Sequence, residues 1–214
     1  MRTVGVLGGT FDPIHLGHLR PAEEVREALQ LAELRLIPAR IPPHRARPRV
    51  CAETRAALVR AAVADHPGAT VDERELHREG PSYTVDTLAE LRAELGPVSL
   101  CLILGLDTFR GLPGWSRWRR LFDYAHLVVT ERPGAGGSLP AALRAELEQR
   151  RCTDPAELRR SVAGRVCFQS VTPVDISATG IRRALACGRS VRYLVPEPVR
   201  ERLAREGLYG YPQL

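Results

Sequence analysis

Lysine and asparagine are both absent from this chain of 214 residues, so its 31 basic residues other than histidine are all arginines. Without lysine, no G-x-x-x-x-G-K-[ST] loop can exist, which excludes the P-loop nucleotide hydrolases. Any contact to a phosphate or carboxylate group must then come from arginine, histidine, a hydroxyl group or a backbone N–H.

Aromatic residues are scarce at 5%, although the formal net charge is +6. Two interpretations fit this charge: a solvated basic surface, or a small anionic substrate. The arginines are spread along the chain rather than gathered in one stripe, and few aromatic rings are available for stacking on bases. We therefore expect no nucleic-acid partner.

The five cysteines form no C-x-x-C pair, and no apolar run is long enough to span a bilayer. Widely spaced cysteines in odd number indicate reduced thiols rather than a disulfide framework or a zinc site. The chain starts directly on a strand pattern, with no signal peptide. We expect a cytoplasmic protein without membrane contact, and a homo-oligomer is compatible with the sequence.

Strand and helix patterns alternate along the chain, which predicts an α/β fold with a Rossmann-like, doubly wound parallel sheet. We expect a single domain with a small C-terminal helical part, and a polar surface insertion or lid at residues 135–164. Strands are predicted at 34–37, 99–104, 127–130 and 166–168, an extended segment at 71–76, and helices at 15–31, 53–65, 85–95 and 197–206.

The most informative segment lies at the N-terminus, where an apolar strand ends in Gly8 and Gly9 and a helix pattern starts near His15. A helix N-terminus that follows a glycine turn offers unpaired N–H groups and the positive end of the helix dipole to a phosphate. The glycine spacing is not G-x-G-x-x-G, and no acidic residue ends the next strand, which argues against a nicotinamide-dependent dehydrogenase.

His15 and His18 lie three residues apart, so we expect them on one face of the first helical turn. Two such histidines without context are most often core residues. A metal site is disfavoured, because zinc requires three or four ligands and no third ligand stands near. Beside a phosphate site, imidazoles can instead donate hydrogen bonds to oxygens that gain charge during phosphoryl transfer.

Two segments together resemble a known superfamily. Gly8-Gly-Thr-Phe-Asp-Pro-Ile-His15-Leu-Gly-His18 is similar to the first motif of the nucleotidyltransferase α/β-phosphodiesterase superfamily. Ile176-Ser-Ala-Thr-Gly-Ile-Arg182 resembles its I-S-x-T-x-x-R motif, in which Ser177 is a plausible N-cap and Arg182 projects one turn later. An ordinary capped helix would explain the second motif alone.

The middle of the chain resembles the bacterial nicotinate-nucleotide adenylyltransferase family. The matching segments include 42–45, 82–88, 105–108 through Trp115, 126–134, 194–196 and 207–209. The resemblance implies transfer of AMP from ATP to nicotinate mononucleotide, giving nicotinate adenine dinucleotide and pyrophosphate in NAD biosynthesis. It covers nearly the whole length, in order, except the 135–164 segment.

The resemblance also implies a role for each matching residue. Catalysis falls to His15, His18 and Arg182. The residues implied for ATP are Gly8, Gly9, Thr10, Phe11, His15, His18, Gly105, Asp107, Ile176, Ser177, Thr179 and Arg182. Those implied for the mononucleotide are Thr10, Phe11, Arg45, Thr84, Trp115 and Arg132. No protein metal site is implied, because Mg²⁺ would arrive bound to ATP.

Two alternatives stay open at this point. The same chemistry could act on nicotinamide mononucleotide or another phosphorylated acceptor. The chain could also be a non-catalytic nucleotide-binding protein, or a nucleic-acid-binding protein that exploits its basic charge.

Overall fold

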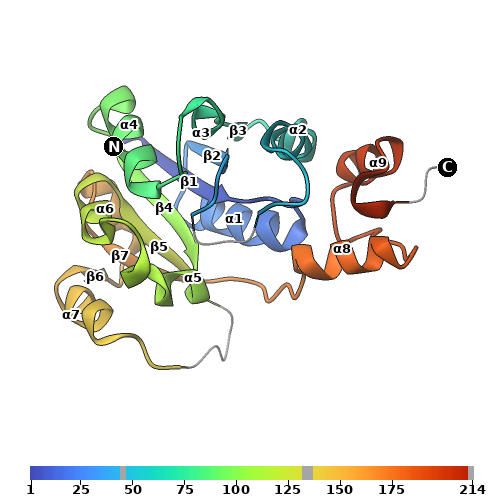
Figure 1. The fold of residues 1–214 in the computed structure, drawn as a ribbon. Helices are drawn as coiled ribbons and strands as arrows, with labels where there is room; N and C mark the ends of the chain where they lie inside the picture. The colour runs from blue at the N-terminus through green and yellow to red at the C-terminus, as the bar shows by residue number, and fades with distance from the viewer. Residues whose placement is uncertain (44–46, 132–136, 212–214) are drawn as a thin grey trace. The chain divides into compact units, whose positions relative to one another are not determined.

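The computed structural model describes residues 1–43, 47–131 and 137–211. They form an α/β fold with a seven-stranded sheet in the order β3-β2-β1-β4-β5-β7-β6 (Figure 1). The strand pairs β1–β4, β4–β5, β5–β7 and β6–β7 are parallel. The strands are β1 (Thr3–Gly9), β2 (Glu33–Pro38), β3 (Ala69–Val71), β4 (Ser99–Gly105), β5 (His126–Glu131), β6 (Arg151–Cys152) and β7 (Val166–Ser170).

Helices follow most of the strands. The α-helices are α1 (Leu16–Ala28), α2 (Ala52–Val63), α3 (Arg74–His77), α4 (Thr84–Leu95), α5 (Leu106–Arg110), α6 (Leu121–Tyr124), α7 (Ala141–Arg150), α8 (Ala178–Ala186) and α9 (Glu197–Arg205). The 3-10 helices are η1 (Leu112–Gly114), η2 (Trp118–Arg120), η3 (Pro155–Arg160) and η4 (Leu208–Gly210). The predicted α/β class and parallel sheet are confirmed.

The core is built on the central strands. Residues 99–104 of β4 are all buried, as expected of a strand covered on both faces. In the register of β1 and β4, Thr3 lies opposite Ser99 and Val6 opposite Leu102. From β1 the strands that follow in the chain extend the sheet first on one side, with β2 and β3, and then on the other side, starting with β4. Parallel α/β sheets bind ligands beyond the carboxyl ends of the two strands at such a change of side. Within unit 1, the ends concerned are Gly8 and Gly105.

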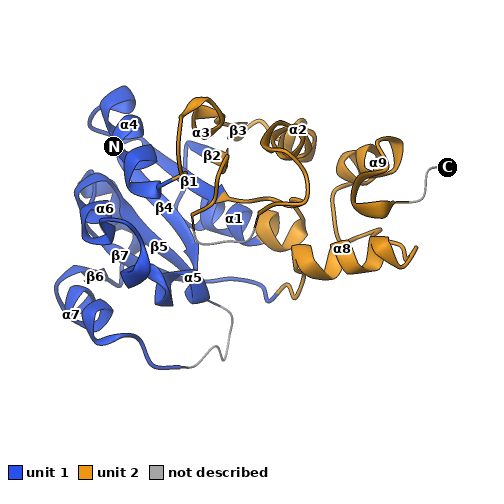
Figure 2. Cartoon of the chain, in the orientation of Figure 1, with its two compact units in different colours: residues 1–8, 21–35, 83–173 blue, residues 9–20, 36–82, 174–214 orange. Residues whose placement is uncertain are grey.

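The chain divides into two compact units, each made of three segments (Figure 2). Unit 1 comprises residues 1–8, 21–35 and 83–173, and unit 2 comprises residues 9–20, 36–82 and 174–214. Unit 1 contains β1 to Gly8, β4, β5 and β7. Unit 2 contains the loop between β1 and α1, together with α2, α8 and α9. The interpretation as a single domain stays a prediction.

The predicted extended segment at 71–76 is wrong in its second half. Strand β3 ends at Val71 and helix α3 begins at Arg74. The Asp72 carboxylate accepts a hydrogen bond from the Arg74 backbone N–H at 3.1 Å, and this local bond favours a helical turn over continued strand pairing.

The segment predicted as a surface insertion or lid folds into α7, β6 and η3 in its described part, residues 137–164. Leu143 and Leu158 are buried, and β6 pairs with β7. Ser99 donates a hydrogen bond to the Leu158 carbonyl at 2.7 Å, which ties η3 to the central strand. These residues therefore contribute to the core of unit 1, while movement as a lid stays a prediction.

Among the described residues, no helix combines the length and apolar character needed to cross a bilayer.

Candidate active site

The loop between β1 and α1 holds an unusual backbone conformation. Phe11 has φ of +47°, in the left-handed region that side chains other than glycine rarely adopt. A Cβ atom on Gly9 would lie 2.8 Å from the Phe11 ring, so only glycine fits there without movement. Gly8 is exposed, and a Cβ there would meet nothing within 4 Å. Strain of this kind is concentrated at functional sites, and the loop presents the Gly8 backbone to solvent.

His15 and His18 are stacked on one another, with ring centroids 3.7 Å apart and planes inclined by 29°. His15 is buried and His18 half-buried. The Phe11 ring meets His18 edge-on at 5.2 Å. The two imidazoles lie side by side, as expected of residues on one face, but the prediction that both belong to the first helical turn is wrong for His15, which precedes the first residue of α1.

One hydrogen bond determines the tautomer of His18. The His15 backbone N–H donates to Nδ1 of His18 at 3.3 Å, so Nδ1 is an acceptor and the proton of the neutral ring lies on Nε2. Burial lowers the pKa of His15 to about 4. Burial, with a further contribution from His15, lowers the pKa of His18 to about 3. Both rings are therefore neutral at pH 7, and His18 acts as an N–H donor rather than as a cation.

The second motif begins α8 as the sequence predicts. The Ser177 hydroxyl accepts a hydrogen bond from the Gly180 backbone N–H at 3.1 Å, which confirms Ser177 as the N-cap. One turn later Arg182 donates to the Thr179 hydroxyl at 3.2 Å. The N-terminus of α8 thus carries Ser177, Thr179 and Arg182 together.

The two motifs are in direct contact within unit 2. Arg182 donates to the Asp12 backbone carbonyl at 2.6 Å, and its guanidinium lies 3.7 Å from the Asp12 carboxylate. A Cβ on Gly17 would lie 2.8 Å from the Ile176 carbonyl oxygen, so the start of α1 and the entry to α8 approach closely. The Arg182 side chain still exposes 26% of its surface, which leaves part of the guanidinium accessible to an anion.

Sequence reasoning did not identify Asp12 as a site residue. Asp12 is buried, and its carboxylate accepts from the Tyr209 hydroxyl at 2.7 Å and from the Arg49 backbone N–H at 3.0 Å. A single acidic residue inside the glycine and histidine motif was the available signal. Its partners lie far away in the sequence, so no local pattern could reveal them.

Arg55 of α2 is a second residue that the sequence did not reveal. It is fully buried and donates to the Thr10 carbonyl at 2.5 Å and to the Arg40 carbonyl at 3.2 Å. Burial lowers its pKa, while the nearby Asp12 carboxylate acts in the opposite direction. Arg55 therefore fixes the β1–α1 loop to the segment that follows β2. Its place in a helix of alanine, leucine and valine gives no sign of this role.

The remaining predicted residues with a described position belong to unit 1, together with Gly8. Gly105 ends β4, and Asp107 in α5 has a carboxylate that is 97% exposed and paired with Arg110 at 2.9 Å. Thr84 begins α4, and Trp115 caps η1; both are half-buried. Arg45 and Arg132 lie outside the described residues.

The predicted residues thus form two groups. The structure brings together, within unit 2, the residues Gly9, Thr10, Phe11, His15, His18, Ile176, Ser177, Thr179 and Arg182. The other predicted residues with a described position belong to unit 1: Gly8, Thr84, Gly105, Asp107 and Trp115.

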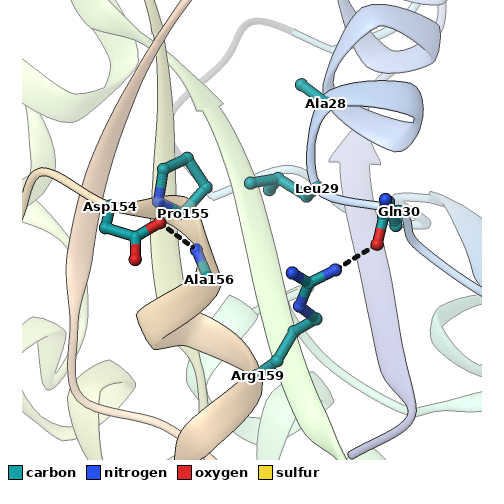
Figure 3. A pocket seen from close by; sticks show the side chains of 7 residues that line it. All are labelled: Ala28, Leu29, Gln30, Asp154, Pro155, Ala156 and Arg159. Carbon is teal, nitrogen blue, oxygen red and sulfur yellow. Dashed lines mark hydrogen bonds between the residues drawn. The ribbon is translucent and has the colours of Figure 1, made fainter.

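No group of three histidine, cysteine, aspartate or glutamate residues among those described is arranged to hold a metal ion. A hollow of about 200 Å³ in unit 1 is lined by Gln30, Asp154 and Arg159, among others (Figure 3). Arg159 donates to the Gln30 side chain there, and the Asp154 carboxylate accepts from the Ala156 N–H at 2.8 Å. None of the predicted site residues lines this hollow.

Comparison with known proteins places the chain among nucleotidyltransferases. Residues 6–184 match the model of the family described as cytidylyltransferase-like. A probable nicotinate-nucleotide adenylyltransferase of Halorhodospira halophila is 76% identical over 100% of this chain and 98% of its own length. One from Aeromonas hydrophila is 51% identical over 96% of each chain.

The fold has solved counterparts as well. One is the structure of Plasmodium falciparum nicotinic acid mononucleotide adenylyltransferase complexed with NaAD. Its superposition on this chain covers 100% of both chains, with a TM-score of 0.75 and 12% sequence identity. At that identity the likeness concerns the fold alone.

Proposed function

The chain belongs to the cytidylyltransferase-like family, and we propose that it transfers AMP from ATP to nicotinate mononucleotide in NAD biosynthesis. The family resemblance predicted from the motifs is confirmed by relatives that match over the full length. The observation that carries the proposal is the contact between the two motifs, in which Arg182 of the second donates to the Asp12 carbonyl of the first.

The reaction needs no nucleophile from the protein. A phosphate oxygen of the mononucleotide attacks the α-phosphorus of ATP, the bond from that phosphorus to the bridging oxygen breaks, and pyrophosphate leaves. Catalysis then consists of holding two polyanions in line and compensating the charge that develops on the α-phosphate oxygens. The guanidinium of Arg182 suits the binding of phosphate groups, and the neutral N–H donor of His18 suits the compensation of the developing charge.

His18 is the residue we assign to the α-phosphate. Its Nδ1 is engaged by the His15 backbone N–H, which directs the remaining proton to Nε2. A neutral donor that is already oriented gains strength as the oxygen becomes more negative and requires no reorganisation. His15 stacks on His18 and fixes the plane of its ring.

The ATP phosphates are assigned to Gly8, Gly9, Ser177, Thr179 and Arg182. Gly8 offers an exposed backbone, and the start of α8 offers N–H groups at the positive end of the helix dipole. Gly105 and the exposed Asp107 carboxylate are assigned to the ribose or to a water bound to Mg²⁺. Mg²⁺ itself would be held mainly by phosphate oxygens of ATP and would help to neutralise their charge.

The mononucleotide is assigned to Thr84 and Trp115, with Arg45 and Arg132. Thr10 and Phe11 are assigned to the junction of the two substrates. Trp115 would stack on the pyridine ring, and Arg132 would pair with the phosphate. Thr84 and backbone N–H groups near Trp115 would meet the nicotinate carboxylate. A cytoplasmic location is part of this proposal, since both substrates are soluble metabolites.

The test is a steady-state assay of pyrophosphate release from ATP and Mg²⁺ with nicotinate or nicotinamide mononucleotide as acceptor. We expect release that depends on the acceptor, with a higher kcat/KM for the nicotinate form. Equal or better use of the nicotinamide form would overturn the assigned acceptor but not the chemistry. No release with either acceptor would overturn the chemistry.

A further inference from the structure

Tyr209 lies near the C-terminal end of the described chain but reaches the N-terminal motif. It belongs to η4, which follows α9 and packs against α8. Its hydroxyl donates to Oδ1 of Asp12 at 2.7 Å, across 197 positions of sequence. Its φ of +57° lies in the left-handed region, and the flanking Gly207 and Gly210 also have positive φ. A side chain with a Cβ is disfavoured in this region, and the hydrogen bond to the buried carboxylate helps to stabilise the conformation.

The Asp12 carboxylate divides its two oxygens between different partners. Oδ1 accepts from Tyr209, whereas Oδ2 accepts from the Arg49 backbone N–H and faces the Arg182 guanidinium. If the Tyr209 bond were lost, Oδ1 would be a buried charged acceptor without its donor, and the carboxylate could rotate away from its present plane. Tyr209, together with the Arg49 backbone N–H, therefore sets the orientation of Oδ2 toward Arg182.

Arg182 in turn has few fixed contacts. Its guanidinium is held by the Asp12 carbonyl, the Asp12 carboxylate and the Thr179 hydroxyl. An arginine side chain loses considerable rotamer entropy when a ligand immobilises it, so prior fixation improves its affinity for phosphate.

We propose that Tyr209 is a positioning residue for Arg182, acting through the Asp12 carboxylate, so that the C-terminal turn sets the affinity for the ATP phosphates. The inference rests on the proposed function insofar as Arg182 binds ATP. Burial and the adjacent Asp12 carboxylate raise the pKa of the Tyr209 hydroxyl. The phenol therefore keeps its proton and acts as a donor throughout the physiological range.

The experiment measures the affinity of the full chain for the α,β-methylene analogue of ATP, which cannot release pyrophosphate, by titration calorimetry with Mg²⁺. We expect Tyr209→Phe to raise the Kd about five- to tenfold, because one hydrogen bond to a charged group is lost. The matched control is Tyr211→Phe, whose hydroxyl contacts Arg200 at 3.3 Å and has no role in the network. It should change the Kd by less than about twofold.

A double-mutant cycle separates positioning from general damage. In an Arg182→Ala background, Tyr209→Phe should change the Kd by less than about twofold, because its effect passes through the missing guanidinium. Asp12→Asn, which keeps the shape of the side chain, should show the same coupling to Arg182 and serves if Tyr209→Phe does not fold. An equal loss in both backgrounds, or no loss with Tyr209→Phe in the wild-type background, would overturn the inference.

Failure of the inference can be distinguished from failure of the proposed function. Coupled loss of analogue binding in a protein that releases no pyrophosphate would sustain the role of Tyr209 and overturn the activity. Normal AMP transfer with unchanged analogue affinity in Tyr209→Phe would sustain the activity and overturn the role of Tyr209.

Discussion

His18 is the residue on which the proposed catalysis depends most. His18 is neutral, oriented by the His15 backbone N–H and supported by the edge of Phe11. Replacement of His18 by alanine should lower kcat about a hundredfold, because a donor to developing charge is lost, while the KM for ATP changes little. Steady-state kinetics of wild type and variant measure both parameters. A change confined to KM would mean that His18 serves only to bind ATP.

His15 and His18 also make the stability of the fold depend on pH. Their pKa values in the folded chain, about 4 for His15 and about 3 for His18, lie below the ordinary value of 6.5. Below pH 6.5 the unfolded chain therefore binds protons that the folded chain does not. The free energy of unfolding should fall as the pH decreases from 6.5, until each folded pKa is reached. Burial also lowers the pKa of His126, which adds to the same trend.

Urea unfolding between pH 6.5 and 5 measures this slope. His18→Gln should reduce it by about 1 kcal/mol per pH unit, since one titrating group is removed. The control is Gln149→Ala at an exposed position, which removes no titrating group and should leave the slope unchanged. A slope for His18→Gln equal to that of the wild type would show that this histidine is not held neutral by the fold.

The start of α1 and the segment just before α8 approach at a point where only glycine fits without movement. Alanine normally stabilises a helix interior by about 1 kcal/mol relative to glycine. At Gly17, however, the added Cβ would lie 2.8 Å from the Ile176 carbonyl and 3.0 Å from Nδ1 of His15. Gly17→Ala should therefore lower the free energy of unfolding by about 1–3 kcal/mol and weaken ATP binding.

Denaturant unfolding and titration calorimetry test this expectation. Gly114→Ala is the control, because a Cβ at that position would meet nothing within 4 Å. A Gly17→Ala chain more stable than the wild type, with unchanged ATP affinity, would refute the close approach of the two segments.

The longer elements could be predicted because their apolar patterns persist over several residues. β4 and α9 are found close to their predicted bounds. The predicted helix at 15–31 ends earlier, at Ala28, since Gln30 adopts a left-handed conformation with φ of +52°. Elements of three to five residues, such as α3, α5 and α6, are too short to show a period.

The candidate site was predictable only where its residues share a local motif. Gly8 and Gly9 end one strand, and His15 and His18 come soon after it. Ser177, Thr179 and Arg182 lie at the start of one helix. Asp12 connects the two motifs through Arg182 and Tyr209, its partners at 170 and 197 positions of separation. Such pairs arise from tertiary packing, which no periodicity encodes. The contacts that join the two motifs could therefore not be predicted from the motifs themselves.

The net charge of +6, supplied entirely by arginine among the strong cations, matches a molecule that gathers two polyanions. Many arginines are paired with carboxylates, including Arg117 with Asp86 and Arg200 with Glu197. Arg182 differs because its carboxylate partner is buried and its own surface is partly exposed. For the proposed reaction, the positive charge of Arg182 at the site therefore matters more than the net charge of the whole chain.

In the proposed reaction, the AMP group with the α-phosphate of ATP moves to the mononucleotide. ATP labelled with ³²P at the α-position, mixed with the protein, Mg²⁺ and nicotinate mononucleotide, tests it most directly. We expect the label to enter the dinucleotide in a one-to-one ratio with the pyrophosphate released. Label recovered as free AMP, or retained in ATP while the acceptor is consumed, would contradict it.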